Sequence, residues 1–373
     1  MSSQLICVNC SADYPISEPI WRCRQCGSLL DIQFEPVIDP VKIRGRSSSL
    51  WRYREAIPIE RDESIVSFGE GFTPLLEVNF GGRPVLVKQD YLFPTGSYKD
   101  RGASVLISKM KELGVGQCVE DSSGNAGCAV AAYCARAGIA CDIYVPFDTA
   151  LAKLAQIQLY GAGLVRIPGS REDTARAVMA AAEAHYYASH SWNPFFFQGT
   201  KTFAYEVCEQ FGWKAPDVVI LPAGNGTLVL GAWIGFEELR RAGIIERSPR
   251  LVAVQSENCA PLAKSWAQNL PEIPAIQKKD TLAEGIAIAE PIRGVQIVKA
   301  VRQSGGEFMT VSDPEIRSSI KNLARQGFYI EPTAAVAAAG VSKYLSVHSQ
   351  PELVVSVFTG SGLKTTEKML SFI

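Results

Sequence analysis

The chain has 373 residues, of which 47% are hydrophobic, and its formal net charge is -1 at pH 7. A chain of this length is expected to form about two to three domains. The balanced charge, without blocks of like sign, argues against nucleic-acid binding and membrane-surface binding. No apolar run reaches the roughly 20 residues of a membrane-spanning helix, and the first residues lack the basic and apolar regions of a signal peptide. We therefore expect a cytoplasmic protein that acts on small molecules.

Four of the ten cysteines form two Cys-X-X-Cys pairs near the N-terminus, "CVNC" and "CRQC". This spacing brings both sulfurs of a pair to one metal ion and predicts a tetrahedral zinc site formed by Cys7, Cys10, Cys23 and Cys26. Such a short segment buries little core, so the metal would supply folding energy, and four cysteine ligands make the site structural. Disulfides or free thiols are the alternative. The other six cysteines occur in apolar or strand-like sequence, where reduced buried thiols are usual.

From about residue 37 the sequence alternates short apolar runs with helical segments. Helices are predicted at residues 99–113, "AGCAVAAYCARAG", "LAKLAQIQLYG" and "REDTARAVMAAAEA". Strands are predicted at "PVLVKQD", "CVED", "ACDIYVP", "LVRIP", "DVVILPA", "RLVAVQS", "EFMTV" and "ELVVSVFTG". Strands that alternate with helices favour parallel sheets covered on both faces. Two such runs, before and after about Ser191, predict two doubly wound α/β domains with a cleft between them.

The predicted domain organisation has three parts. Residues 1–36 form a zinc-ribbon-like segment, residues 37–102 and 191–373 form a large α/β domain, and residues 103–190 form a small α/β domain.

Three glycine-rich turns follow predicted strands, namely "DSSGNAG", "PAGNGT" and "FTGSGLK". In parallel sheets, ligands bind where the carboxyl ends of strands meet the amino ends of helices. One such turn alone is weak support, because glycine and asparagine are common in tight turns. The "GNGT" turn opens a predicted helix, so its backbone N–H groups suit a phosphate. It matches neither the dinucleotide fingerprint nor the Walker pattern, and we therefore predict the phosphate of a small cofactor.

Lys99 lies in "GSYKDRGA", between a glycine turn and a predicted helix. A lysine amine on such a turn, together with a phosphate-binding turn, suits a Schiff base with an aldehyde cofactor. In the order "GSYKDRGA", "SSGNAG", "GNGT" and "TGSGLK", the chain resembles the pyridoxal-phosphate enzymes of the tryptophan-synthase β, or type II, fold. The resemblance extends over nearly the whole chain from about Gly69.

The resemblance implies a role for each matching residue. Lys99 would bind the cofactor covalently and act as general base, since none of the three histidines lies inside these motifs. The remaining implied contacts are Asn125 with the ring hydroxyl, Ser122, Ser123 and Gly124 with the substrate carboxylate, Gly224, Asn225, Gly226 and Thr227 with the cofactor phosphate, and Thr359 with the pyridine nitrogen. A neutral threonine hydroxyl does not enforce a protonated ring nitrogen, which favours elimination and replacement over transamination.

Within this family the chain is most similar to the threonine synthase group. The supporting motifs are the four-cysteine segment ending "CGSLLDI", the lysine motif, "AAYCARAG", "NPFFFQGTKTFAYE", "TGSGLK" and "EPTAAVAAAG". The resemblance implies conversion of O-phosphohomoserine and water to threonine and phosphate, by γ-elimination and β-hydration. The substrate phosphate then needs a second site, for which the candidates are Ser122, Ser123, Asn193 and backbone donors, together with a cation such as Lys201.

The chain also departs from the threonine synthase pattern. Ala126 stands where the group commonly has threonine, Phe196 or a neighbour where it has arginine, and Ser361 where it has histidine. The segment "EGIAIAEP" is closer to that of serine and threonine dehydratases. A serine or threonine ammonia-lyase, another β-replacement enzyme, and a cofactor-binding relative without turnover are therefore alternatives.

Two further segments allow more than one interpretation. Glu284 is either a carboxylate near the cofactor or a structural residue at a helix end, and "NPFFF" lines the substrate cleft or belongs to the core. The resemblance also implies a homodimer that takes a small amino-acid substrate.

Overall fold

The computed structural model describes residues 3–149, 151–169, 171–370 and 372. The chain forms two compact units. The first contains the described residues of Met1–Asp39, Arg46–Glu70 and Lys99–Thr200, and the second contains those of Pro40–Gly45, Gly71–Tyr98 and Lys201–Ile373. The division into residues 1–36, 37–102 with 191–373, and 103–190 uses other boundaries and remains a prediction about domains.

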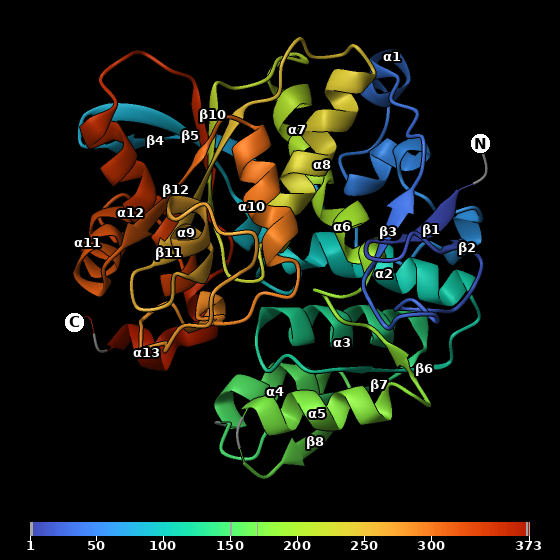
Figure 1. Cartoon of the computed structure of the whole chain (residues 1–373). Helices are drawn as coiled ribbons and strands as arrows, with labels where there is room; N and C mark the ends of the chain where they lie inside the picture. The colour runs from blue at the N-terminus through green and yellow to red at the C-terminus, as the bar shows by residue number, and fades with distance from the viewer. Residues whose placement is uncertain (1–2, 150, 170, 371, 373) are drawn as a thin grey trace. The chain divides into compact units, whose positions relative to one another are not determined.

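The first unit contains a four-stranded parallel sheet in the order β8-β7-β6-β9. Its strands are β6 (Gln117–Glu120), β7 (Ala140–Pro146), β8 (Gly163–Ile167) and β9 (Tyr186–Tyr187). Its helices are α2 (Lys99–Glu112), α3 (Asn125–Ala137), α4 (Leu151–Leu159), α5 (Arg171–Ala181) and α6 (Pro194–Thr200), with the 3₁₀ helices η1 (Leu50–Ala56) and η2 (Asp62–Ser64). Helices α3 and α5 both pack against β7 (Figure 1). The predicted helices and parallel strands of this part are confirmed.

An antiparallel three-stranded sheet precedes these elements in the first unit. Its order is β2-β1-β3, with β1 (Gln4–Cys7), β2 (Asp13–Pro15) and β3 (Leu30–Gln33). Leu5, Cys7 and Leu30 are buried in the same hydrophobic core as β6, β7 and α3. Trp21 adds a hydrogen bond from Nε1 to the carbonyl oxygen of Ala182, at 3.3 Å. The cysteine-rich segment therefore packs as part of the first unit.

The second unit contains a six-stranded sheet in the order β12-β11-β10-β13-β5-β4. Its strands are β4 (Leu75–Phe80), β5 (Arg83–Lys88), β10 (Val218–Pro222), β11 (Arg250–Ser256), β12 (Glu307–Val311) and β13 (Val354–Val357). All pairings are parallel except that of β4 with β5. Gly81 and Gly82 form the two-residue turn between these two, both with positive φ, as a tight hairpin requires. The edge strand β4 was not predicted.

Helices cover both faces of this sheet. Figure 1 shows α11 and α12 on one side of β10 to β12, and α8 and α10 on the other. The helices are α1 (Pro40–Arg44), α7 (Thr202–Gln210), α8 (Thr227–Arg241), α9 (Pro261–Ala267), α10 (Gly294–Gln303), α11 (Asp313–Ala324), α12 (Pro332–Val347) and α13 (Thr366–Leu370), with η3 (Asp90–Leu92), η4 (Glu284–Ile286) and η5 (Gly362–Thr365). All five residues of β10 are buried, as expected for a central strand covered on both faces. No helix among the described residues combines the length and apolar composition needed to cross a bilayer.

Candidate active site

Lys99 is the first residue of α2 and is half-buried. Its Nζ lies 5.7 Å from the centroid of the Phe196 ring, which belongs to α6 and is fully buried. The amine therefore lies beside an aromatic face rather than beside a charged side chain of α6. Phe196 is part of the "NPFFF" segment, and its burial supports the interpretation of that segment as core.

Two glycines allow α6 to approach α2 closely. A Cβ added to Gly102 would lie 2.3 Å from the Phe196 ring, and a Cβ added to Gly199 would lie 1.9 Å from the carbonyl oxygen of Arg101. Neither position has room for a larger residue. Gly102, the second glycine of the "GSYKDRGA" motif, therefore allows the Phe196 ring to lie beside Lys99.

Replacing Gly102 with alanine should destabilise the protein. The added methyl group overlaps the Phe196 ring, and overpacking of a core costs about 1–3 kcal/mol. Gly116→Ala is the matched control, because a Cβ there meets no atom within 4 Å. Urea unfolding of both variants measures the difference, and equal stabilities would show that α2 and α6 are not packed this closely.

The turn between β6 and α3 carries Ser122, Ser123 and Gly124, and Asn125 is the first residue of α3. The N–H of Gly124 donates to Ser122 Oγ at 3.3 Å. A Cβ on Gly127 would lie 1.8 Å from the carbonyl oxygen of Ser122, so this turn requires glycine there. Because the turn opens a helix, the N–H groups at the helix start and the helix dipole suit a carboxylate or phosphate.

A buried acid–imidazole pair lies directly before this turn and was not predicted. Glu120, the last residue of β6, is fully buried, and its Oε1 lies 2.8 Å from Nδ1 of His190. Burial raises the pKa of Glu120 well above its usual range. The His190 ring in turn lies 6.0 Å from the ring of Phe196. No motif indicated either residue, because a single acid and a single histidine lie far apart in the sequence.

In the second unit, the "GNGT" turn joins β10 to α8. Gly226 has φ +63°, and a Cβ there would lie 2.3 Å from Ile297 Cδ1. A Cβ on Gly224 would lie 2.7 Å from Cα of Ile286. With Asn225 between them and Thr227 opening α8, this turn has the form predicted for a phosphate site.

Thr359 follows β13, the neighbour of β10 in the sheet. Its Oγ1 is buried, and in the part of the chain that the structure describes it has no hydrogen-bond partner. A buried hydroxyl without a partner costs free energy unless a ligand supplies one. This atom therefore fits a contact with the nitrogen of a cofactor ring.

Tyr98 connects these two turns. Its hydroxyl lies 2.8 Å from Thr227 Oγ1, and its N–H donates to the carbonyl oxygen of Thr359 at 2.9 Å. The residue that precedes Lys99 in the chain is thus fixed to both the phosphate-type turn and the Thr359 turn. Sequence reasoning gave Tyr98 no role, although the residue lies inside the quoted lysine motif.

The two predicted substrate contacts outside the turns have partners within the protein. Asn193 is fully buried, its Nδ2 donates to the Tyr186 hydroxyl at 2.8 Å, and its Oδ1 accepts from the N–H of Phe195 at 3.1 Å. Lys201 is fully buried, and its Nζ lies 3.0 Å from Glu238 Oε1. These contacts stabilise the fold, and the predicted roles in substrate binding remain predictions.

Glu284 lies in η4 and is exposed. Its Oε1 lies 2.9 Å from Lys368 Nζ. This ion pair supports the structural interpretation of the residue.

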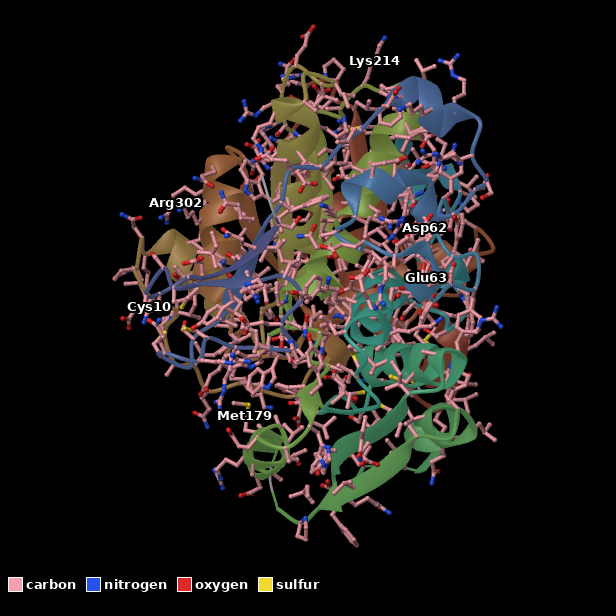
Figure 2. The ribbon with its side chains drawn as sticks, turned by 90° about the vertical axis from the view of Figure 1, so that its right-hand side faces the viewer. Cys10, Asp62, Glu63, Met179, Lys214 and Arg302 are labelled. Atoms are coloured by element: carbon pink, nitrogen blue, oxygen red, sulfur yellow. The ribbon has the colours of Figure 1, made fainter. Side chains whose placement is uncertain are left out.

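The four N-terminal cysteines converge. All four Sγ atoms lie within 4.8 Å of one another, with 3.4 Å between Cys7 and Cys26 and 3.6 Å between Cys10 and Cys23. The N–H groups of Asn9 and Cys10 both point to Cys7 Sγ at 3.4 Å. Cys10 is exposed, and its side chain lies toward the edge of the view in Figure 2. Four soft sulfur donors at these separations suit a tetrahedral zinc ion.

Comparison with known proteins gives the class of this chain. The family described as "Pyridoxal-phosphate dependent enzyme" matches residues 66–360, and the chain belongs to this family. Solved structures of other proteins share the fold, among them the following two. The processed form of threonine deaminase isoform 2 from Solanum lycopersicum has a TM-score of 0.70 and 19% identity, and the match covers 88% of this chain and 90% of that one. Maize serine racemase has a TM-score of 0.67 and 20% identity, and the match covers 80% of this chain and 93% of that one.

Curated relatives make the comparison more specific. The chain is 36% identical to the threonine synthase of Methanocaldococcus jannaschii, over 96% of this chain and 92% of that protein. It is 34% identical to the threonine synthase of Methanosarcina acetivorans, over 98% and 93%. The threonine synthase of Synechocystis sp. is 35% identical, over 85% of each chain. Within the pyridoxal-phosphate dependent enzymes, the chain is therefore a relative of the threonine synthases.

Proposed function

We propose that this protein is a threonine synthase that converts O-phosphohomoserine and water to threonine and phosphate. The observation that carries the proposal is the 36% identity to a threonine synthase over 96% of the chain. An alignment of that length includes the lysine motif and most of the glycine-rich turns. The residues of both units that match the family's motifs support the same conclusion.

We further propose that the protein binds one molecule of pyridoxal phosphate. Lys99 would bind it covalently, Asn125 would contact its ring hydroxyl, Gly224, Asn225, Gly226 and Thr227 would hold its phosphate, and Thr359 would face its ring nitrogen. The support is the buried unpartnered Thr359 Oγ1 and the turn whose glycines cannot carry a Cβ. When bound, the cofactor supplies an electron sink for the carbon that bears the amino group.

The protein's own residues would bind and orient the substrate and move its proton. Ser122, Ser123 and the N–H of Gly124 would hold the substrate carboxylate at the amino end of α3. The Lys99 amine, once free, would take the proton from the α-carbon, since a positioned base contributes about 10²–10⁴-fold. Asn193 and Lys201 would contact the substrate phosphate in addition to the partners that each already has inside the protein.

A serine or threonine ammonia-lyase is the second candidate, and one observation favours it. The threonine synthase group commonly has an arginine at the position of Phe196 or a neighbour, whereas Phe196 packs against Gly102 and brings no charge for a substrate phosphate. Offering O-phosphohomoserine, threonine and serine in parallel separates the candidates. We expect phosphate and threonine from O-phosphohomoserine. Ammonia and an oxo acid from threonine, without phosphate release from O-phosphohomoserine, would assign the chain to the lyases.

We propose that Cys7, Cys10, Cys23 and Cys26 hold one structural zinc ion. The Tyr14 hydroxyl lies 3.1 Å from Cys23 Sγ and also accepts the N–H of Arg24 at 3.1 Å. Because the oxygen accepts from the backbone, its own proton is available to Cys23. Hydrogen bonds of this kind orient metal ligands and tune the affinity.

Removing that hydrogen bond should weaken zinc binding. Tyr14→Phe is expected to lower the zinc affinity about tenfold, the lower end of the range for the loss of an outer-shell partner. Competition with a chromophoric chelator measures the affinity. Replacement of Tyr53, a buried tyrosine outside the cysteine-rich segment, with phenylalanine is the control.

Replacing Cys10 with serine should disorder the first thirty or so residues, about the length of the segment that the metal would organise. Turnover should persist at least in part. A metal-free native protein with an ordered N-terminus would contradict the zinc proposal.

We propose that the protein is a cytoplasmic homodimer, in which the dimer is implied by the resemblance and the location by the composition of the chain. Cell fractionation and sedimentation at several concentrations test the two parts.

A further inference from the structure

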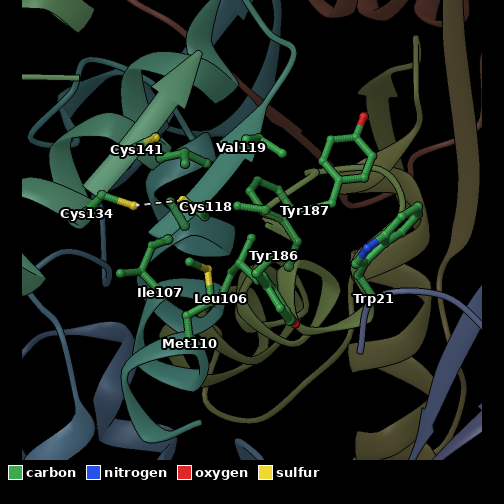
Figure 3. Close-up of a cluster of buried hydrophobic side chains, with 14 of the residues drawn as sticks. Trp21, Leu106, Ile107, Met110, Cys118, Val119, Cys134, Cys141, Tyr186 and Tyr187 are labelled. Atoms are coloured by element: carbon green, nitrogen blue, oxygen red, sulfur yellow. Dashed lines mark hydrogen bonds between the residues drawn. The ribbon is translucent and has the colours of Figure 1, made fainter. Parts of the chain in front are cut away.

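A second group of cysteines lies in the core of the first unit, away from the N-terminal four. Cys118 lies on β6, Cys134 on α3 and Cys141 on β7. Their three Sγ atoms all lie within 4.8 Å of one another, and those of Cys118 and Cys134 are 3.6 Å apart. Figure 3 shows the three thiols together, with the contact between Cys118 and Cys134 drawn as a dashed line.

These separations match those of three sulfurs bound to one ion. For a distance of about 2.3 Å between the ion and each sulfur, three sulfurs lie about 4 Å apart around a planar centre and about 3.4 Å apart around a pyramidal one. Only small side-chain rotations are therefore needed to close the three thiols around an ion. Since they come from three different elements, the fold itself brings them together.

The surroundings select the kind of ion. All three cysteines are buried in a hydrophobic cluster that also contains Leu106 and Met110 of α2 (Figure 3). Hard cations such as magnesium and calcium prefer oxygen ligands, whereas thiolates select soft ions. A net charge in a dry core is costly, so the complex should be neutral. Three thiolates are neutralised by a trivalent ion.

We propose that Cys118, Cys134 and Cys141 form a binding site for a trivalent soft metalloid of the arsenite class. Arsenous acid is uncharged, and its reaction with three thiols is balanced without a change of oxidation state. Three S–H and three As–OH bonds break, three As–S bonds form, and three water molecules leave. No oxidant or reductant takes part, and both the reactant and the buried product are neutral.

Closing the site would join β6 to α3, the elements on either side of residues 121–124. A ligand that binds the folded state in this way raises its stability.

The test uses the purified full-length protein incubated with arsenite. Native mass spectrometry counts arsenic and zinc, X-ray absorption counts the sulfurs around arsenic, and thermal unfolding measures stability. Cys134→Ala and Cys118→Val each remove one thiol. Alanine suits helix α3 and valine suits strand β6, so each substitution keeps the secondary structure. Cys208→Ala, which removes a buried thiol in the second unit, is the matched control.

We expect arsenic bound to three sulfurs, with a raised melting temperature, in the native protein and in Cys208→Ala. Losing one of three linked bonds should weaken arsenic binding by at least about tenfold in both cluster variants. Circular dichroism identifies a cluster variant that has not folded. In that case the arsenic affinity of the other, folded cluster variant tests the proposal. If the folded cluster variants bind as much arsenic as the control, with equal affinity, the proposal is wrong. Arsenic uptake that matches zinc loss, and is unchanged by these variants, would place the metalloid on the N-terminal cysteines instead.

Discussion

Replacing Lys99 with alanine should abolish turnover and remove the covalent bond between the protein and pyridoxal phosphate. The alanine has no amine to bond the cofactor aldehyde, and the base that takes the α-proton is lost with it. Loss of the general base alone costs about 10²–10⁴-fold, and loss of the covalent link adds to it. Borohydride reduction of the native enzyme should fix the cofactor to the peptide that contains Lys99.

Two variants sharpen this prediction. Lys99→Arg keeps a positive charge beside Phe196 but should also be inactive, because guanidinium does not form the bond with the aldehyde. Lys111→Ala, on the exposed part of α2, should keep its activity and its absorbance band. A colourless native protein that takes up no added cofactor would refute the cofactor assignment, as would full turnover in Lys99→Ala.

Replacing Glu238 with glutamine should be the most destabilising of the polar substitutions considered. Glu238 lies 3.0 Å from the fully buried Lys201 ammonium and also accepts a hydrogen bond from the Tyr205 hydroxyl. Breaking a buried ion pair from one side typically costs about 3–5 kcal/mol, because the other charge stays in the core. Urea unfolding near neutral pH measures this loss.

The pH dependence gives a second readout for this pair. Burial lowers the pKa of Lys201 from its ordinary value of 10.5, whereas Glu238 raises it. In Glu238→Gln the folded-state pKa of Lys201 should fall further, while the unfolded-state value is unchanged. The unfolded state then binds more protons between these two values, so stability rises with pH in that window. The deficit of the variant should therefore shrink as the pH rises from the folded-state pKa of Lys201 in the variant to the higher folded-state pKa of Lys201 in the native protein.

The same pair tests the predicted role of Lys201 in substrate binding. The double variant Lys201→Met with Glu238→Leu should recover most of the lost stability, because no charge remains buried. If Lys201 binds the substrate phosphate, this folded variant will show a raised KM for O-phosphohomoserine with a smaller change in kcat. An unchanged KM would leave Lys201 with the structural role alone.

Most of the α/β architecture could be predicted because its strands are continuous apolar runs. Strand β10, for example, is buried along its whole length, and such a strand differs clearly from the helices around it. The strands of the cysteine-rich segment and the edge strand β4 were missed. These are short or mix polar with apolar residues, and half of the six residues of β4 are exposed, so neither type gives a clear apolar run.

Candidate site residues could be identified where backbone conformation dictates the residue type, and their roles stay predictions. The glycine-rich turns and Lys99 were recognised because four short motifs, "GSYKDRGA", "SSGNAG", "GNGT" and "TGSGLK", follow one another along the chain in the order of the family. Tyr98 was missed because its hydrogen bonds to Thr227 and Thr359 join segments more than a hundred residues apart in sequence. Lys201 was interpreted as a charge available to the substrate because it lies in a motif. In the structure its ammonium group is paired with the carboxylate of Glu238 on α8. Sequence spacing does not reveal such tertiary partners.

The proposed reaction is tested most directly by running O-phosphohomoserine turnover in ¹⁸O-labelled water. Elimination followed by hydration breaks the bond between carbon and the phosphate oxygen, and the new hydroxyl comes from water. We therefore expect labelled threonine together with unlabelled phosphate, in equal amounts. Labelled phosphate with homoserine would show hydrolysis at phosphorus and would contradict the proposed function, as would the absence of threonine from an enzyme loaded with pyridoxal phosphate.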